Sequence, residues 1–115
     1  MWKRIYLKLK EKGLNPYAPG QHEGQCMERY CVIGESSQVP FFNNRHVGYR
    51  LIDIMAFVPL ESYVEIESYV KEIKVAMKEL AFIRCTGNET PIIADNEKKA
   101  YTTSIEYQII KRLEG

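Results

Sequence analysis

The residues that could bind a metal ion are His22, Cys26 and Cys31, in the spacing H-x3-C-x4-C. Structural zinc sites use four closely spaced cysteine or histidine ligands in a small set of recurring patterns. This spacing matches none of those patterns, and a fourth ligand is missing. We therefore interpret these residues as a loop histidine and two ordinary thiols, and we expect neither a metal nor another cofactor.

A cysteine nucleophile with His46 as its base is the second chemistry to consider. A thiol becomes reactive when a helix N-terminus or a nearby cation lowers its pKa. The sequence around Cys26, Cys31 and Cys85 offers no such setting. The odd number of cysteines, together with an N-terminus unlike a signal peptide, favours reduced thiols in a protein made in the cytosol.

The glutamates of the segment 60–80 are a third candidate. Paired carboxylates perform acid–base catalysis when burial or a cleft separates their pKa values. Here lysines alternate with the glutamates, which is typical of a solvated helix face. The sequence also contains no G-x-G-x-x-G motif or other phosphate-binding loop. We therefore predict that the protein is not an enzyme.

The composition is that of a single soluble domain spanning residues 1–115, with 45% hydrophobic and 27% charged residues. A net charge of +1 argues against a surface that neutralises nucleic-acid phosphates and against a polybasic membrane patch. No apolar run is long enough to span a bilayer.

The stretch 47–58, VGYRLIDIMAFV, predicts the central strand of the fold, and Pro59 is expected to end it. A half-buried strand alternates apolar and polar residues, whereas both faces of this stretch are mostly apolar. Asp53 is the only charge on the second face. We therefore expect helices against one face and a partner surface against the other. The first face carries Ile52, Ile54, Ala56 and Val58, and the second carries Val47, Tyr49, Leu51, Met55 and Phe57.

Hydrophobic periodicity predicts the other elements. Helices are expected over 2–12 and 60–80, the second with a capping box formed by Ser62 and Glu65. Strands are expected over 29–35, 82–86 and 100–113, and loops over 15–24, 34–48 and 87–99. The resulting order αββαββ predicts an α+β domain with two layers, an antiparallel sheet of about four strands and two helices on one of its faces.

The predicted loop 34–48 contains two consecutive phenylalanines, Phe41 and Phe42. One interpretation, which we favour, is that they fold back over an edge of the core. The other is that they dock into a neighbouring subunit, because contiguous exposed apolar residues mark an interface.

Three segments together resemble a known family. They are NPYAPGQHEGQC at 15–26, GYRLIDIMAFVP at 48–59, and RCTGNETP with the closing strand YTTSIEYQIIKR within 84–112. This pattern is similar to the small tail-terminator, or tail-completion, proteins of tailed bacteriophages and phage-like particles of Gram-positive bacteria.

The resemblance implies a structural subunit of the virion tail or neck, made in the host bacterial cytoplasm. Such subunits form a hexameric ring that caps the tail tube, stops its elongation and joins it to the head-side connector. The implied partners are further copies of the chain, the tail tube protein, the connector and, in a contractile tail, the sheath protein. DNA passes through the lumen of the ring, and no membrane is involved.

A closed ring needs two different patches that match each other. Our hypothesis for the contact residues rests on apolar or aromatic residues outside the helix-facing core, together with the loop 86–91. The candidates for subunit or tail-tube contacts are Phe41, Phe42, Arg45, Tyr49, Leu51, Thr86, Asn88 and Pro91.

Three other functions remain open at this point. The chain could be another neck component, such as a head-closure or connector protein. It could also be a small metal- or ligand-binding domain that uses His22, Cys26 and Cys31. A third possibility is a dimeric adaptor that buries the second sheet face against a copy of itself.

Overall fold

The computed structural model of the protein describes residues 2–41 and 44–112, without the side chains of 36–41, 44–49 and 110–112. In these ranges the chain forms two α-helices and a six-stranded mixed sheet, so the fold is α+β as predicted. The elements are α1 (Trp2–Glu11), β1 (Pro16–Tyr17), β2 (Tyr30–Phe41), β3 (Asn44–Pro59), the 3-10 turn η1 (Leu60–Ser62), α2 (Glu65–Met77), β4 (Ile83–Glu89), β5 (Ile93–Asp95) and β6 (Ala100–Arg112).

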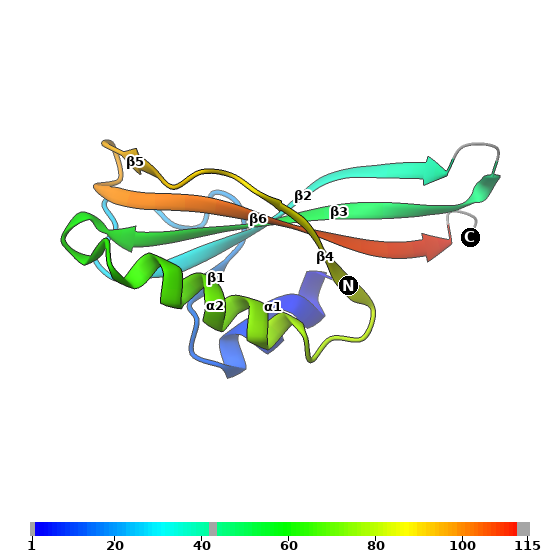
Figure 1. Cartoon of the computed structure of the whole chain (residues 1–115), viewed down its shortest axis with the longest axis horizontal. Coiled ribbons are helices and arrows are strands. Elements are labelled where there is room, and N and C mark those ends of the chain that lie inside the picture. Colours follow the sequence, from blue (N-terminus) through cyan, green and yellow to red (C-terminus); the bar gives the residue numbers. More distant parts are fainter. Residues whose placement is uncertain (1, 42–43, 113–115) are drawn as a thin grey trace.

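Both helices lie on one face of the sheet (Figure 1). Helix α1 buries Ile5 and Leu9, which recur at helical spacing. It ends at Gly13, whose φ of +72° suits a glycine, and Leu14 beyond it is buried. Neither helix in the described part of the chain is long and apolar enough to cross a membrane.

Helix α2 confirms the predicted apolar stripe, but it starts later and ends earlier than expected, so that Leu80 lies beyond it. The stripe residues are all buried, namely Ile66, Val70, Ile73, Met77 and Leu80. The predicted capping box is wrong, because the N-cap position is Val64 and no side chain caps the helix. Ser62 belongs instead to the turn η1, which separates β3 from the helix. Glu65 lies in the first turn, where a carboxylate suits the positive end of the helix dipole.

The sheet has the strand order β1-β2-β3-β6-β4, with β5 also paired to β6. The predicted antiparallel sheet of about four strands in the order αββαββ is therefore wrong in detail. Strand β1 adds a parallel edge, in which the Cys31 N–H donates to the carbonyl oxygen of Asn15 at 3.1 Å. Strands β1 and β5 have two and three residues, too few to show an alternating pattern.

The largest correction concerns 34–48, which was predicted to be a loop. Strands β2 and β3 instead continue through most of this segment as an antiparallel hairpin, with Val39 opposite Tyr49 and Phe41 opposite Asn44. Pro40 hid the strand in the sequence, because proline cannot donate to a sheet ladder. It is tolerated here because β2 is an edge strand over this length.

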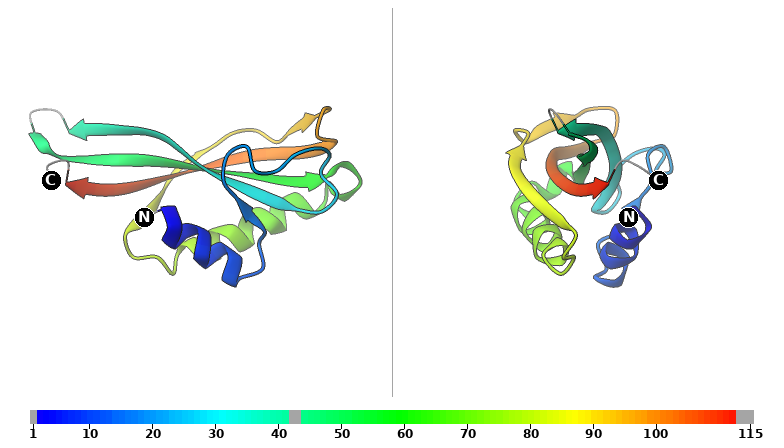
Figure 2. Two further views of the ribbon diagram at one scale, coloured as in Figure 1. Left: turned by 180° about the vertical axis from the view of Figure 1, so that it is seen from behind. Right: turned by 90° about the vertical axis from the view of Figure 1, so that its right-hand side faces the viewer.

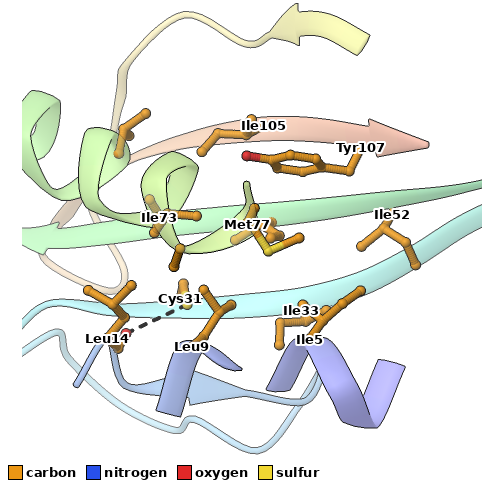
Figure 3. Close-up of a cluster of buried hydrophobic side chains, with 14 of the residues drawn as sticks. Ile5, Leu9, Leu14, Cys31, Ile33, Ile52, Ile73, Met77, Ile105 and Tyr107 are labelled. Atoms are coloured by element: carbon orange, nitrogen blue, oxygen red, sulfur yellow. Dashed lines mark hydrogen bonds between the residues drawn. The ribbon is translucent and has the colours of Figure 1, made fainter. Parts of the chain in front are cut away.

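The main core lies between the sheet and the helices (Figure 3). Ile52, Ile54, Ala56 and Val58 of β3 are all fully buried there, as the period-two pattern predicted. The final strand contributes alternate residues, including Ile105, Tyr107 and Ile109. A buried hydrogen bond from Tyr69 Oη to the carbonyl oxygen of Leu14, 2.6 Å long, joins α2 to the segment after α1.

The second face of the sheet is partly covered by the chain itself. Tyr30, Cys26 and Phe57 form a separate buried cluster there, and His22 stacks on Tyr30 with ring centroids 3.7 Å apart. The prediction that a partner covers the whole second face of the central strand is therefore wrong for the Phe57 end. The segment between β1 and β2 covers that end instead.

One half of the sheet extends beyond the helices (Figures 1 and 2). We call this three-stranded extension the arm, defined as 36–41 of β2, 44–50 of β3 and 109–112 of β6. It accounts for the elongated shape of the molecule, whose principal extents are 48 × 26 × 24 Å.

Candidate assembly surface

The outer edge of β2 becomes open where the arm begins. Strand β1 pairs only with Cys31 and Val32. The next carbonyl oxygen, that of Ile33, accepts a 2.8 Å hydrogen bond from the Trp2 Nε1–H of α1. From Gly34 onward, no described strand lies on the outer side of β2. Such an edge presents backbone donors and acceptors that another strand can pair with.

The opposite edge of the arm belongs to β6. Strand β4 joins β6 at the pair Ile83–Ile109, and beyond this pair β6 continues to Arg112 alongside β3 alone. The described arm therefore has two open edges, β2 on one side and β6 on the other. Because these edges come from different strands, they are two distinct surfaces.

Three predicted contact residues lie on the arm by their backbone. Phe41 is the last residue of β2, and Arg45 and Tyr49 lie on β3. Their side chains are outside the described part of the structure, and so is the whole of Phe42. Neither interpretation of the two phenylalanines is therefore tested.

Leu51 lies on β3 where the arm meets the body, on the face away from the helices. It is opposite Gln108 of β6 and is partly exposed. It shares this face with Asp53 and Met55, as the alternating pattern predicted.

The predicted contacts Thr86 and Asn88 lie away from the arm and form a local polar cluster with Glu106. Thr86 Oγ1 donates to Glu106 Oε1 at 2.8 Å, and Asn88 Nδ2 donates to the same oxygen at 2.9 Å. These bonds hold β4 against β6 at its irregular stretch, where the register shifts between Cys85 and Glu89. These hydrogen bonds give Thr86 and Asn88 a structural role in the sheet.

Pro91, the last predicted contact, lines a groove between α2 and the β4–β5 connection. The groove also contains Ile92, Val70 and Thr103, with Lys74 and Glu89 forming an ion pair of 2.6 Å at its side. Pro91 is thus apart from the arm, whereas Thr86 and Asn88 bond to Glu106, two residues along β6 from Gln108, the partner of Leu51.

An acidic pair lies on the second face, next to Leu51. Asp53 of β3 is directly opposite Glu106 of β6, and its neighbour on β2 is Gly34, which has no side chain. Burial raises the pKa of Asp53, and the negative charge of Glu106 raises it further. Like charges opposite each other in a sheet destabilise it.

The structure places Cys31 apart from Cys26 and His22. Cys31 belongs to the core beneath the helices, whereas Cys26 belongs to the cluster on the other sheet face. Burial raises the pKa of each of these two thiols to about 11, so both stay protonated near neutral pH. Among the side chains that the structure describes, no three from His, Cys, Asp or Glu are placed to hold a metal ion. The side chain of His46 lies outside the described residues.

The sequence matches no family model, and the comparison with curated proteins gives no match either. The candidate surface therefore rests on the structure and on the residues of the chain itself.

Sequence reasoning predicted the arm residues 47–50 and 109–112 as strand but missed the rest of the arm, the acidic pair and the aromatic stack at His22. Asp53 was visible as the only charge on its strand face, but its partner depends on the register between β3 and β6. The arm had a sequence signal too, because apolar residues such as Val39 and Val47 lie on both sides of residues 42–43. Pro40 and the polar residues 43–46 obscured this strand pattern.

Proposed function

We propose that this protein is a tail-terminator subunit that assembles through its arm into a hexameric ring. In this proposal the ring caps the tail tube of a phage or phage-like particle, stops its elongation and joins it to the head-side connector. The protein acts structurally, with no catalytic step.

The observation that carries the proposal is the arm. A three-stranded sheet is stabilised by packing one face against helices or another sheet, and the helices of this chain stop short of the arm (Figure 1). The arm sequence nevertheless contains Val39, Phe41, Val47 and Ile110, which are not typical of an exposed ribbon. A neighbouring subunit supplies the missing packing surface in our proposal.

The two open edges suit a closed ring. A ring needs a heterologous interface, in which one patch of a subunit contacts a different patch of the next. The β2 edge and the β6 edge of the arm are two such patches, and strand pairing between them would link subunits through backbone hydrogen bonds. Pro40 cannot donate to that ladder, so we assign the pairing on β2 to the residues before it.

The proposed partners follow from the ring. One ring face contacts the tail tube protein, and the other contacts the head-side connector, with the sheath protein as a further partner in a contractile tail. DNA only passes through the lumen. The net charge of +1 fits this role, because a strongly basic lumen would retain DNA.

Light scattering on the purified protein, alone and with polymerised tail tubes, tests the proposal. Six subunits of 13.4 kDa give a ring of about 80 kDa. A mass near that value, or tubes that stop growing when the protein is added, would support the proposal. A monomer that leaves tube length unchanged would contradict it. Binding to the portal complex instead of the tube would favour a head-closure protein.

A pair of double variants tests whether the arm makes the contact. Phe41→Ser with Phe42→Ser is expected to leave a folded monomer that no longer forms rings or caps. The control, Met27→Ser with Val64→Ser, removes two apolar side chains that are 81% and 86% exposed and lie outside the arm. It should assemble normally. Normal rings from the phenylalanine variant would refute the role of Phe41 and Phe42 in assembly.

A further inference from the structure

We infer that the segment 18–29 is a pH-sensitive cover on the second sheet face, closed when His22 is neutral and opened when His22 is protonated. This inference concerns the fold itself and does not depend on the proposed function.

The cover is held by an aromatic stack that crosses from the loop to the sheet. His22 lies flat on the ring of Tyr30, at 3.7 Å and 5° between planes, and Tyr30 in turn stacks on Phe57 at 4.6 Å. Tyr17 of β1 meets His22 edge-on, with centroids 5.1 Å apart. Among these four aromatic side chains, His22 thus comes from a loop, whereas the other three come from strands.

The environment of His22 accommodates a neutral ring better than a cation. Its Nδ1 is buried without a hydrogen-bond partner, and so is the hydroxyl oxygen of Tyr30. An imidazolium carries an N–H on both ring nitrogens, so protonation would bury a charged Nδ1–H with no acceptor. Attraction between the cation and the Tyr30 ring face opposes this effect but supplies no acceptor.

Burial lowers the pKa of His22, and the positive charge of Lys98, in the turn before β6, lowers it further. The other titratable side chains facing the stack are Tyr17 of β1, Tyr30 of β2 and Cys26 of the loop. Besides burial, the negative charge of Asp95 raises the pKa of Tyr30, and the charges of Glu61 and Glu28 raise the pKa of Cys26.

Arg29 at the end of the cover is tied to α2, because it forms an ion pair with Glu72 and lies over the Tyr69 ring at 4.8 Å. The Cys26 N–H donates to the carbonyl oxygen of Lys98 at 2.6 Å, and Asn15 Nδ2 donates to the carbonyl oxygen of Arg29 at 2.9 Å. These bonds lie near the C-terminal end of the loop. Opening between Ala18 and Gln25 would therefore uncover part of Tyr30 and Phe57 while the strands stay paired.

The sign of the pH effect follows from linkage. The closed cover holds the His22 pKa below its ordinary value of about 6.5, so the open form binds the proton more readily. The cover is fully stable above about pH 6.5 and loses stability as the pH falls toward the lowered pKa. The opening constant can rise up to about tenfold for each unit between the two pKa values.

Hydrogen exchange of the peptide covering 18–29 at pH 7.5 and 5.5, corrected for the intrinsic exchange rate, tests this inference. Wild type should lose protection in this peptide at the lower pH. His22→Phe keeps a flat ring on Tyr30 but cannot be protonated, so its protection should not change with pH. His46→Gln, which removes the only other histidine in the sequence, should behave as wild type.

An NMR titration of the His22 ring protons in wild type provides a second test that needs no substitution. It should give a pKa below about 6.5. A pKa at or above that value would overturn the inference. So would an equal loss of protection in His22→Phe and wild type, or constant protection in wild type between the two pH values.

Discussion

The Trp2 Nε1–H of α1 donates a 2.8 Å hydrogen bond to the carbonyl oxygen of Ile33 on β2. This bond occupies the last part of the β2 edge before the arm begins, directly after the two residues paired with β1. It separates the edge into a part covered by the chain itself and a part that is open. The proposed subunit interface begins at this point.

Trp2→Phe tests the structural value of this bond. Phenylalanine can keep the stacking of Trp2 on Tyr6, whose ring centroids are 5.3 Å apart, but it has no N–H. We expect the free energy of unfolding to fall by about 1 kcal/mol, the usual net value of such a hydrogen bond. Urea denaturation measures it. An unchanged urea midpoint would mean that water hydrogen-bonds to the Ile33 carbonyl oxygen in place of the indole without any loss of stability.

Tyr69→Phe removes the buried hydroxyl that joins α2 to Leu14. The bond is 2.6 Å long, and among the described residues the Cys31 thiol is a second, longer donor to the same carbonyl oxygen, at 3.6 Å. We expect a loss of about 1–2 kcal/mol in unfolding free energy, because a buried acceptor is left poorly satisfied. Tyr63→Phe, at a side chain that is 50% exposed, is the control and should change stability little. Equal effects of the two variants would contradict this assignment.

Asp53→Asn should stabilise the protein at pH 7. The change removes the repulsion between Asp53 and Glu106 on neighbouring strands while it keeps the side-chain shape. The expected gain in unfolding free energy is about 0.5 kcal/mol, within the range of cross-strand pairs. Chemical denaturation of both proteins at pH 7 measures the difference.

The pH dependence of that difference is an internal control. Folding raises the pKa of Asp53, so the folded state binds its proton more readily than the unfolded state. The contribution of Asp53 to the stability of wild type is therefore full below about pH 3.9 and declines as the pH rises through the raised pKa. The advantage of Asp53→Asn should vanish at low pH. A constant advantage at all pH values would show that charge is not its cause.

Ile54→Ala should be among the most damaging single changes. Ile54 is fully buried between β2 and β6 on the helix-facing side, and its truncation should cost about 2–5 kcal/mol. Ile93→Ala is the matched control, because the same truncation at a side chain that is 59% exposed should cost about 0.5 kcal/mol or less. Thermal unfolding of both variants measures the contrast. Similar losses would mean that Ile93 is covered in solution.

The parts of the fold that were predictable from sequence are those with a long, regular pattern. Alternation in β3 identified Ile52 and Ile54 as core residues, and the spacing in α2 identified Ile66 and Ile73. The capping box failed because Ser62 and Glu65 have the required spacing but the 3-10 turn η1 comes between strand and helix.

The part of the arm within 36–46 and the short edge strands could not be predicted for a different reason. Their formation depends on pairing with another strand, such as Asn15 with Cys31 and Val39 with Tyr49. Local signals such as Pro40 pointed toward a loop. The same dependence on register concealed the Asp53–Glu106 pair.

Electron microscopy of isolated tail tubes incubated with the purified protein tests the central claim most directly. We predict a six-fold ring at one end of each tube, with the arms of neighbouring subunits in contact around it, and no such ring for Phe41→Ser with Phe42→Ser. Bare tube ends at saturating protein would contradict the terminator function. A ring whose subunits contact each other without their arms would contradict the proposed mode of assembly.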